Sequence, residues 1–319
     1  MNYLLETEKL TKQYGSQKAV NEVSLHLEKG AIYGFIGRNG AGKTTFLKMI
    51  CGMAKPTSGS ITLFGKKDSE RASVMPKVGA LIEAPGIYPG MTAYDNLKLK
   101  CRAAGINKNG YIEDILKTIG LEKVGRKKAG CFSLGMKQRL GIGMALVGDP
   151  ELLILDEPIN GLDPQGIIEV REMLINLCQN RGITIIISSH ILEELSKIAT
   201  HFGIIDHGVL IKEVTNEQLH EECKACVKLK VAENDDVAAD VLKSLNYKFN
   251  KTEDNNFDIF IPETDIPDTV FALAEKKIKI LSISIENDSI EDYFIKLTSK
   301  SEIASAKTNN KQSGGKKNG

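Results

Sequence analysis

Two continuous apolar runs dominate the hydrophobic pattern of the chain, LLIL at residues 152–155 and ITIII at residues 183–187. Apart from Thr184, both runs are apolar at successive positions instead of every second one, which is typical of parallel strands that are covered on both faces. Asp156 and Glu157 follow the first run directly, and His190 comes shortly after the second. Because ligands of open α/β sheets bind at the carboxyl ends of the strands, these polar residues mark an expected functional site.

The patterns elsewhere predict how the chain divides into domains. Short alternating segments occupy residues 3–28, and helical spacing runs through residues 92–146. From about residue 215 the pattern changes to a β-α-β-β-α-β-α order, which is typical of a small ferredoxin-like domain. We therefore expect an α/β domain at residues 1–214, a small α+β domain at residues 215–300 and a disordered polar tail at residues 301–319.

Composition and charge narrow the classes of function. The 319 residues are 42% hydrophobic and 26% charged, as in ordinary globular proteins, and the net charge is +1. This balance gives no electrostatic reason to expect a nucleic-acid partner. The sequence shows no apolar run long enough to span a membrane and no signal sequence. Its six scattered cysteines are interpreted as reduced thiols of a cytosolic protein.

A phosphate-binding loop is the clearest motif, with the sequence GRNGAGKTT between a strand pattern and a helix pattern. Its glycines let backbone amides converge on a β-phosphate, and the helix N-terminus adds positive potential. Lys43 is placed to reach the β- and γ-phosphates, and the Thr44 hydroxyl is placed to bind Mg²⁺. The expected ATP contacts of this loop are Gly37, Arg38, Asn39, Gly40, Ala41, Gly42, Lys43, Thr44 and Thr45.

The polar residues after the two apolar runs supply the second half of an ATP site. Asp156 is placed to hold Mg²⁺ directly or through water, and Glu157 can polarise the attacking water as a general base. His190 can bond the γ-phosphate and hold that water. The alternatives are a carboxylate pair that caps a helix and a structural histidine. Together with the phosphate loop, the pattern favours Lys43, Glu157 and His190 as catalytic residues, with ATP and Mg²⁺ as cofactors.

Five motifs together resemble the ATP-binding cassette (ABC) ATPases. GRNGAGKT, FSLGMKQRL, LLILDEP, NGLDPQG and SSH occur in the family order over residues 1–215. The resemblance implies a P-loop ABC ATPase domain, in which a mixed sheet carries a helical subdomain. By the same resemblance, Tyr14 stacks on adenine. Ser133, Gly135, Met136 and Asp163 are implied to face ATP held by a second nucleotide-binding domain, from either another copy of this chain or a paralogue.

Two positions depart from the family pattern. The signature loop reads FSLGM where the family usually has LSGGQ, and the conserved chemistry of its serine and second glycine predicts a working site; a weakened site is the alternative. No glutamine occurs between Gln17 and Gln138, and Glu83 stands where the family has a glutamine that senses Mg²⁺ and contacts the membrane partner. A carboxylate can also bind Mg²⁺, but it brings negative charge near the triphosphate. The alternative is a surface residue on a displaced loop.

The stretch ALIEAPGIYPGMTAYDNL resembles a glutamate-loop subgroup, the ATPases of bacitracin- and lantibiotic-type exporters that protect bacteria from peptide antibiotics. The C-terminal region, ending SIEDYFIKLT, is similar to the appended domain of that broader exporter group. This resemblance implies a separate multispanning permease that docks on residues 83–96. The chain is then expected to lie peripherally at the cytoplasmic face of the cell membrane.

Two other classes of function compete with the exporter subunit. A soluble ABC ATPase could act on the ribosome or on DNA, but the translation-factor type carries two cassettes and the DNA-repair type a long coiled coil. The sequence shows neither feature. A binding module without catalysis is the second alternative, and the presence of Lys43, Asp156, Glu157 and His190 argues against it.

Overall fold

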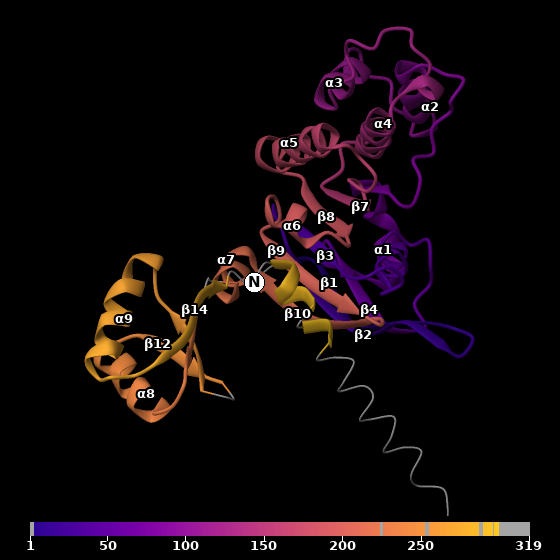
Figure 1. Ribbon diagram of the computed structural model, residues 1–319. Coiled ribbons are helices and arrows are strands. Elements are labelled where there is room, and N and C mark those ends of the chain that lie inside the picture. Colours follow the sequence, from indigo (N-terminus) through magenta and orange to yellow (C-terminus); the bar gives the residue numbers. More distant parts are fainter. Residues whose placement is uncertain (1–2, 224–225, 253–254, 287–289, 296, 300–319) are drawn as a thin grey trace, which may run out of the picture. The chain divides into compact units, whose positions relative to one another are not determined.

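The chain folds into two compact units, which divide between Asn216 and Glu217. The computed structural model describes residues 3–223, 226–252, 255–286, 290–295 and 297–299 (Figure 1). The tail at residues 301–319, predicted to be disordered, lies outside the described residues. No helix in the described part of the chain has the length and apolar character needed to cross a membrane.

A six-stranded, mostly parallel sheet forms the centre of the first unit. Its order is β10 (Val209–Thr215), β9 (His201–Asp206), β3 (Ile32–Ile36), β8 (Thr184–Ser189), β7 (Leu152–Asp156) and β6 (Val78–Leu81). Every residue of β3, β7 and β8 is buried, because helices and a second sheet cover the two faces. The two apolar runs are therefore confirmed as neighbouring parallel strands, β7 and β8.

The second sheet of this unit is antiparallel and packs on the central sheet through α1 (Lys43–Ile50). Its order is β2 (Gln17–Glu28), β1 (Tyr3–Tyr14), β4 (Ser58–Leu63) and β5 (Lys66–Lys67). The alternating apolar side chains of β1 and β2 join one hydrophobic core with Phe35 of β3 and Phe46 of α1, whose rings stack with centroids 4.7 Å apart. This core fixes α1, and with it the phosphate loop, against the end of β3.

Besides α1, the described chain forms six further α-helices up to residue 223. Three of them lie together at the top of Figure 1, above the labels of β7 and β8: α2 (Ala93–Ala103), α3 (Tyr111–Thr118) and α4 (Leu134–Leu146). They confirm the helical spacing predicted within residues 92–146. α5 (Pro164–Arg181) and α6 (Leu192–Ser196) follow β7 and β8, and α7 (Asn216–Glu222) begins at the division of the units. Short 3-10 turns occupy Asp68–Ser73, Met75–Lys77, Ala129–Cys131 and Glu263–Asp265.

The second unit has the predicted β-α-β-β-α-β-α order, with residues 290–295 helical after the last strand. It consists of β11 (Cys226–Val231), α8 (Asp235–Ser244), β12 (Lys248–Lys251), β13 (Asn256–Phe260), α9 (Ile266–Glu275) and β14 (Ile280–Glu286). The sheet order is β12-β13-β11-β14 with antiparallel neighbours, which is the ferredoxin-like arrangement. Val227, Leu229, Phe257 and Ile259 of the sheet pack with Leu242 and Leu273 of the helices in one core.

A buried tyrosine ties the centre of the main sheet to its edge. Tyr33 of β3 is only 1% exposed, and its hydroxyl donates to Glu213 Oε1 of β10 at 2.6 Å. Gly203 of β9 leaves room for this ring, because a Cβ there would lie 2.5 Å from the Tyr33 hydroxyl oxygen. Burial, and then the charge of Glu213, raises the pKa of Tyr33 well above its ordinary value. Tyr33 is therefore a permanent donor to the carboxylate.

We expect Tyr33→Phe to destabilise the first unit, because Glu213 loses a hydrogen bond from a buried donor. The expected loss is about 1–2 kcal/mol in the free energy of unfolding. Calorimetry of the full chain should show it as a lower Tm. Tyr88→Phe is the control, since Tyr88 is 53% exposed and its ring carries little of the core. Equal melting of the two variants would contradict a stabilising role for the Tyr33–Glu213 bond.

Candidate functional site

The loop between β3 and α1 takes a backbone conformation that needs glycine. Gly40 and Gly42 have φ values of 81° and 106°, in the left-handed region that L side chains avoid. A Cβ on Gly42 would also lie 2.3 Å from the Ala19 carbonyl oxygen. Gly42 is the N-cap of α1, so the loop turns directly into a helix whose first amides point outward without intrahelical partners. Such a terminus attracts an anion.

A cavity of about 500 Å³ lies over this loop. Its walls come from four places in the chain: the start of β2, the phosphate loop, the residues that follow β7 and the residues that follow β9. The lining residues are Gln17, Lys18, Ala19, Asn39, Gly40, Gly42, Lys43, Thr44, Thr45, Glu157, Asn160, His207 and Gly208. The cavity is of the size that holds small molecules in proteins, and most of its lining is polar.

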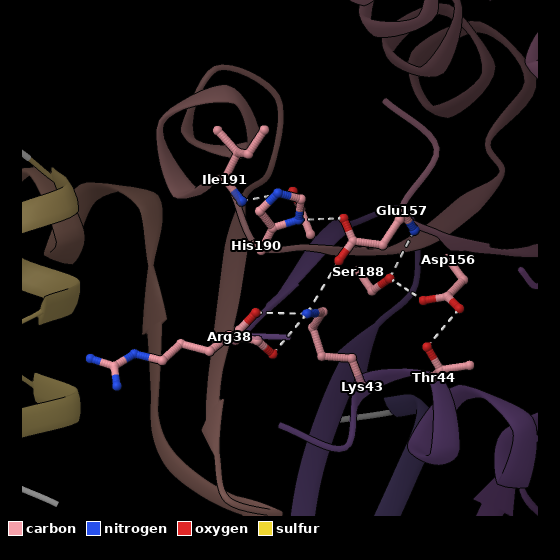
Figure 2. Close-up of polar contacts among 10 residues, drawn as sticks. Arg38, Lys43, Thr44, Asp156, Glu157, Ser188, His190 and Ile191 are labelled. Carbon is pink, nitrogen blue, oxygen red and sulfur yellow. Dashed lines mark hydrogen bonds and ion pairs between the residues drawn. The ribbon is translucent and has the colours of Figure 1, made fainter. Parts of the chain in front are cut away.

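Lys43 is a buried cation whose charge is fully satisfied. Its ammonium donates to the carbonyl oxygens of Gly37 at 2.6 Å and Arg38 at 3.2 Å, and it lies 3.2 Å from Glu157 Oε1. Its side chain is 5% exposed. Figure 2 shows the Lys43 amine beneath the loop, while the Arg38 side chain extends away from this cluster. The loop therefore uses the backbone of Arg38 to hold the lysine.

Asp156 is held by two hydroxyl groups at the end of β7. The Thr44 hydroxyl donates to its Oδ2 at 2.8 Å, and the Ser188 hydroxyl donates to its Oδ1 at 2.6 Å. Hydroxyl and carboxylate oxygens are the ligands that Mg²⁺ prefers, so these residues fit a magnesium ion. Among the described residues, no group of three or more His, Cys, Asp or Glu side chains could hold a metal ion. A magnesium ion held by one hydroxyl and one carboxylate would keep other coordination positions for water or phosphate oxygens.

Glu157 lies between a lysine and a histidine. Its Oε1 faces Lys43, and its Oε2 lies 2.9 Å from His190 Nδ1 (Figure 2). Glu157 has a φ of 50°, which is uncommon for a residue with a side chain. Its amide donates to the Ser188 hydroxyl at 2.9 Å and to the Ser188 carbonyl at 3.2 Å, and these bonds hold the turn. These contacts fix the Glu157 carboxylate at the wall of the cavity.

Ser188 is the site residue that sequence analysis missed. It bonds both Asp156 and the backbone of Glu157, although only His190 was assigned a role in the SSH motif. The sequence signal that could have identified Ser188 is the expected pairing of the two apolar runs as neighbouring parallel strands. Parallel register places Asp156 opposite Ser188, so a hydroxyl at that position faces the carboxylate.

The four residues assigned to a second subunit's ATP form a separate surface. Ser133 caps α4 by accepting from the Met136 amide at 3.3 Å, and Asp163 caps α5 by accepting from the Gly166 amide at 3.2 Å. A Cβ at Gly135 would lie 3.9 Å from the Gly166 Cα, so the two helix N-termini are adjacent.

Tyr14 ends β1 at the mouth of the cavity. It pairs with Gln17, which lines the cavity, and its side chain is 53% exposed. The Lys12 amine lies 4.9 Å from the centre of the Tyr14 ring. The ring itself is not part of the cavity wall, but it is available to a flat ligand group at the cavity edge.

Glu83 lies in the loop between β6 and α2 and contacts Lys48 of α1. The Lys48 amine is 2.5 Å from Glu83 Oε1, and the described contacts of Glu83 include neither Thr44 nor Asp156. Its φ is 64°. Further along the same loop, the carbonyl oxygens of Pro89 and Met91 accept from the amides of Gly130 and Ala129, both at 2.8 Å. The loop is therefore bonded to the segment that leads into Ser133.

Comparison with known proteins finds similarity to ABC transporter ATP-binding proteins. The family model described as "ABC transporter" matches residues 20–160. The bacitracin transport ATP-binding protein BcrA of Enterococcus faecalis is 43% identical over 300 residues, covering 93% of this chain and 97% of that protein. The lantibiotic transport ATP-binding protein SrtF of Streptococcus pyogenes is 43% identical over 210 residues, covering 66% of this chain and 90% of that protein.

Solved structures resemble mainly the first unit. A structure of an ATP-binding subunit of an ABC transporter is 30% identical, with a TM-score of 0.60, and covers 69% of this chain and 92% of that one. A crystal structure of the ADP conformation of an ATP-binding cassette is 25% identical, with a TM-score of 0.63, and covers 70% of this chain and 95% of that one. These likenesses confirm the predicted fold class of the larger domain.

We expect Ser188→Ala to lower the kcat for ATP hydrolysis, because Asp156 loses a donor and the strained turn at Glu157 loses an acceptor. Removal of a residue that orients a metal ligand predicts a fall of about tenfold. A steady-state assay of phosphate release measures it. Ser60→Ala, which removes a hydroxyl bonded to Glu8 in the second sheet, is the matched control. A kcat equal to that of the control would show that Ser188 has no part in the chemistry.

Proposed function

This chain belongs to the ATP-hydrolysing subunits of ABC transporters, and on that premise we propose that it powers the export of peptide antibiotics through a separate membrane permease. The carrying observation is its similarity to a bacitracin transport ATP-binding protein over 93% of its length. That match includes the second unit. The match to the lantibiotic transport protein covers 90% of that protein but only 66% of this chain. The similarity therefore favours a bacitracin-type peptide over a lantibiotic.

The site residues divide the work of hydrolysis between binding and proton transfer. Lys43 and the amides of the phosphate loop bind the β- and γ-phosphates, with the α1 N-terminus adding positive potential. Thr44 and Asp156 would hold Mg²⁺, which when bound neutralises charge on the phosphates. Tyr14 stacks on the adenine at the cavity edge. This assignment is supported by the Thr44–Asp156 bond and by the position of Lys43 at the cavity wall.

Glu157 activates the attacking water, and His190 orients both. The carboxylate accepts a proton from the water as its oxygen attacks the γ-phosphorus, and the bond from that phosphorus to ADP breaks. The 2.9 Å contact between His190 Nδ1 and Glu157 Oε2 supports this pairing. The 3.2 Å contact between Glu157 Oε1 and the Lys43 amine holds the other oxygen of the carboxylate.

A second nucleotide-binding domain completes each site. Ser133, Gly135, Met136 and Asp163 are grouped on one surface with two exposed helix N-termini, so they are suited to face the triphosphate of a partner. The partner is another copy of this chain or a paralogue. ATP draws the two domains together and hydrolysis releases them, which provides a two-state interface for mechanical work.

The loop that contains Glu83 couples this interface to a multispanning permease at the cytoplasmic face of the membrane. Residues 83–96 form the docking surface. The backbone bonds from Pro89 and Met91 to residues 129–130 support the proposal, because they connect the docking loop to the segment before Ser133. A groove of about 300 Å³ beside the loop, lined by Glu83, Lys48 and Lys100 with apolar residues, is suited to receive a permease segment.

We expect Glu157→Gln to abolish hydrolysis while ATP still binds. The amide keeps the shape of the side chain but cannot accept a proton, so the rate should fall at least about 100-fold. Phosphate release and binding of a fluorescent ATP analogue, measured on the same sample, separate the two effects. Glu172→Gln, which changes an exposed residue of α5, should hydrolyse ATP as the unchanged chain does. Rapid hydrolysis by Glu157→Gln would assign the base to another residue.

We also expect a tagged chain to co-purify with a multispanning permease from gently solubilised membranes of its native cell. Deleting the gene should make the cell more sensitive to bacitracin-type peptides, and the Glu157→Gln gene should not restore resistance. Ribosomal proteins in place of a permease would instead support a soluble ABC ATPase. Full resistance in the deletion strain would reject the peptide-antibiotic substrate while leaving the transporter assignment intact.

A further inference from the structure

Lys48 lies close to the nucleotide site without touching the phosphate loop. It stands four residues after Thr44 on α1, so the two side chains share one face of the helix. Thr44 is bonded to Asp156, and one turn further along Lys48 is bonded to Glu83. Two residues on one face of α1, one turn apart, therefore each bind a carboxylate from another segment.

The charges around Lys48 favour its protonated form. The hydrogen bond to Glu83 is the main reason that the pKa of Lys48 is raised, and the charges of Glu83, Tyr14 and Asp156 act in the same direction. Lys48 thus lies in the field of both carboxylates. Without it, Glu83 would add an unbalanced negative charge at the edge of a site that binds a polyphosphate, and like charges repel at this range.

The backbone at Glu83 also depends on a partner. A φ of 64° is unfavourable for a residue with a side chain, and the side chain is 64% exposed. An exposed glutamate on a strained turn has many alternative rotamers in water, and ordering it costs entropy. The contact with Lys48, whose side chain is 32% exposed, selects one of them and directs the carboxylate toward α1.

We propose that Lys48 is a positioning residue for Glu83, which balances the charge of Glu83 and holds its carboxylate against α1, one turn after Thr44, so that ATP binding depends on the pair and not on Glu83 alone. The proposal rests on the proposed function only in placing Glu83 at the working site. It explains how a carboxylate is tolerated there. When Glu83 is replaced by a neutral residue, Lys48 has no negative charge there to balance, so its removal should no longer weaken ATP binding.

The test is a double-mutant cycle on the purified full-length chain, with the binding of a fluorescent ATP analogue as the readout. Lys48→Met keeps the length of the side chain and removes its charge. Because this variant breaks the partly exposed Lys48–Glu83 ion pair near the bound nucleotide, we expect it to bind the ATP analogue about fivefold more weakly at low salt. The effect should be smaller at high salt, which screens exposed charges. In the Glu83→Gln background, Lys48→Met should change the affinity less than twofold. Binding in EDTA should show the largest loss, because no cation then offsets the freed carboxylate.

Lys100→Met is the matched control. Lys100 lines the same groove, and no ion pair with a described carboxylate is found for it, so its removal tests a general loss of positive charge. Equal weakening by Lys48→Met in both Glu83 backgrounds, or equal weakening by Lys100→Met, would overturn the proposal. Melting temperatures of all variants identify any loss of folding. The result does not depend on the export experiment, because a chain that binds no permease still gives the full binding cycle.

Discussion

Parallel pairing of β7 with β8 sets Asp156 opposite Ser188, and the geometry of the nucleotide site follows from that register. The Ser188 hydroxyl bonds one oxygen of Asp156, which leaves the other to Thr44 at the start of α1. Ser188 also accepts from the amide of the next residue, Glu157, and so holds a turn that the backbone alone would disfavour. A slip of one residue between the strands would move Asp156 to the other face of the sheet and separate all of these groups.

The charges at the site are arranged so that no buried group stands alone. Lys43 is neutralised by Glu157 and two carbonyl oxygens, and Asp156 is bonded by two hydroxyl donors. Because an unpaired charge in this environment would be very costly, the satisfied network keeps each side chain in place before a ligand arrives. Preorganised charge of this kind is what phosphoryl transfer requires, since its chemistry is mostly positioning and electrostatic stabilisation. Further along α1, the charge of Glu83 is likewise paired with that of Lys48.

The loop from Glu83 to Met91 contacts both α1 and the segment that leads into α4. At one end Glu83 is bonded to α1, which carries the phosphate loop on its N-terminus. At the other end its carbonyl groups accept from residues 129 and 130, just before Ser133 caps α4. The loop is therefore bonded both to the helix that follows the phosphate loop and to the segment that precedes Ser133. Such a link is suited to a subunit that converts closure of a nucleotide interface into movement of a partner.

Most of the fold and half of the site were readable from local sequence. Continuous apolar runs gave β7 and β8, the change of periodicity gave the ferredoxin-like unit, and the glycines of residues 37–42 gave the phosphate loop. Each of these signals depends on residues that are near one another in the chain. Ser188 bonds Asp156 across 32 residues, and Lys48 bonds Glu83 across 35, and no periodicity reports such distant pairs. Sequence alone determined which chemical groups the chain possesses, whereas strand register and helix packing decided which of them meet, because those contacts form only when distant segments close on one core.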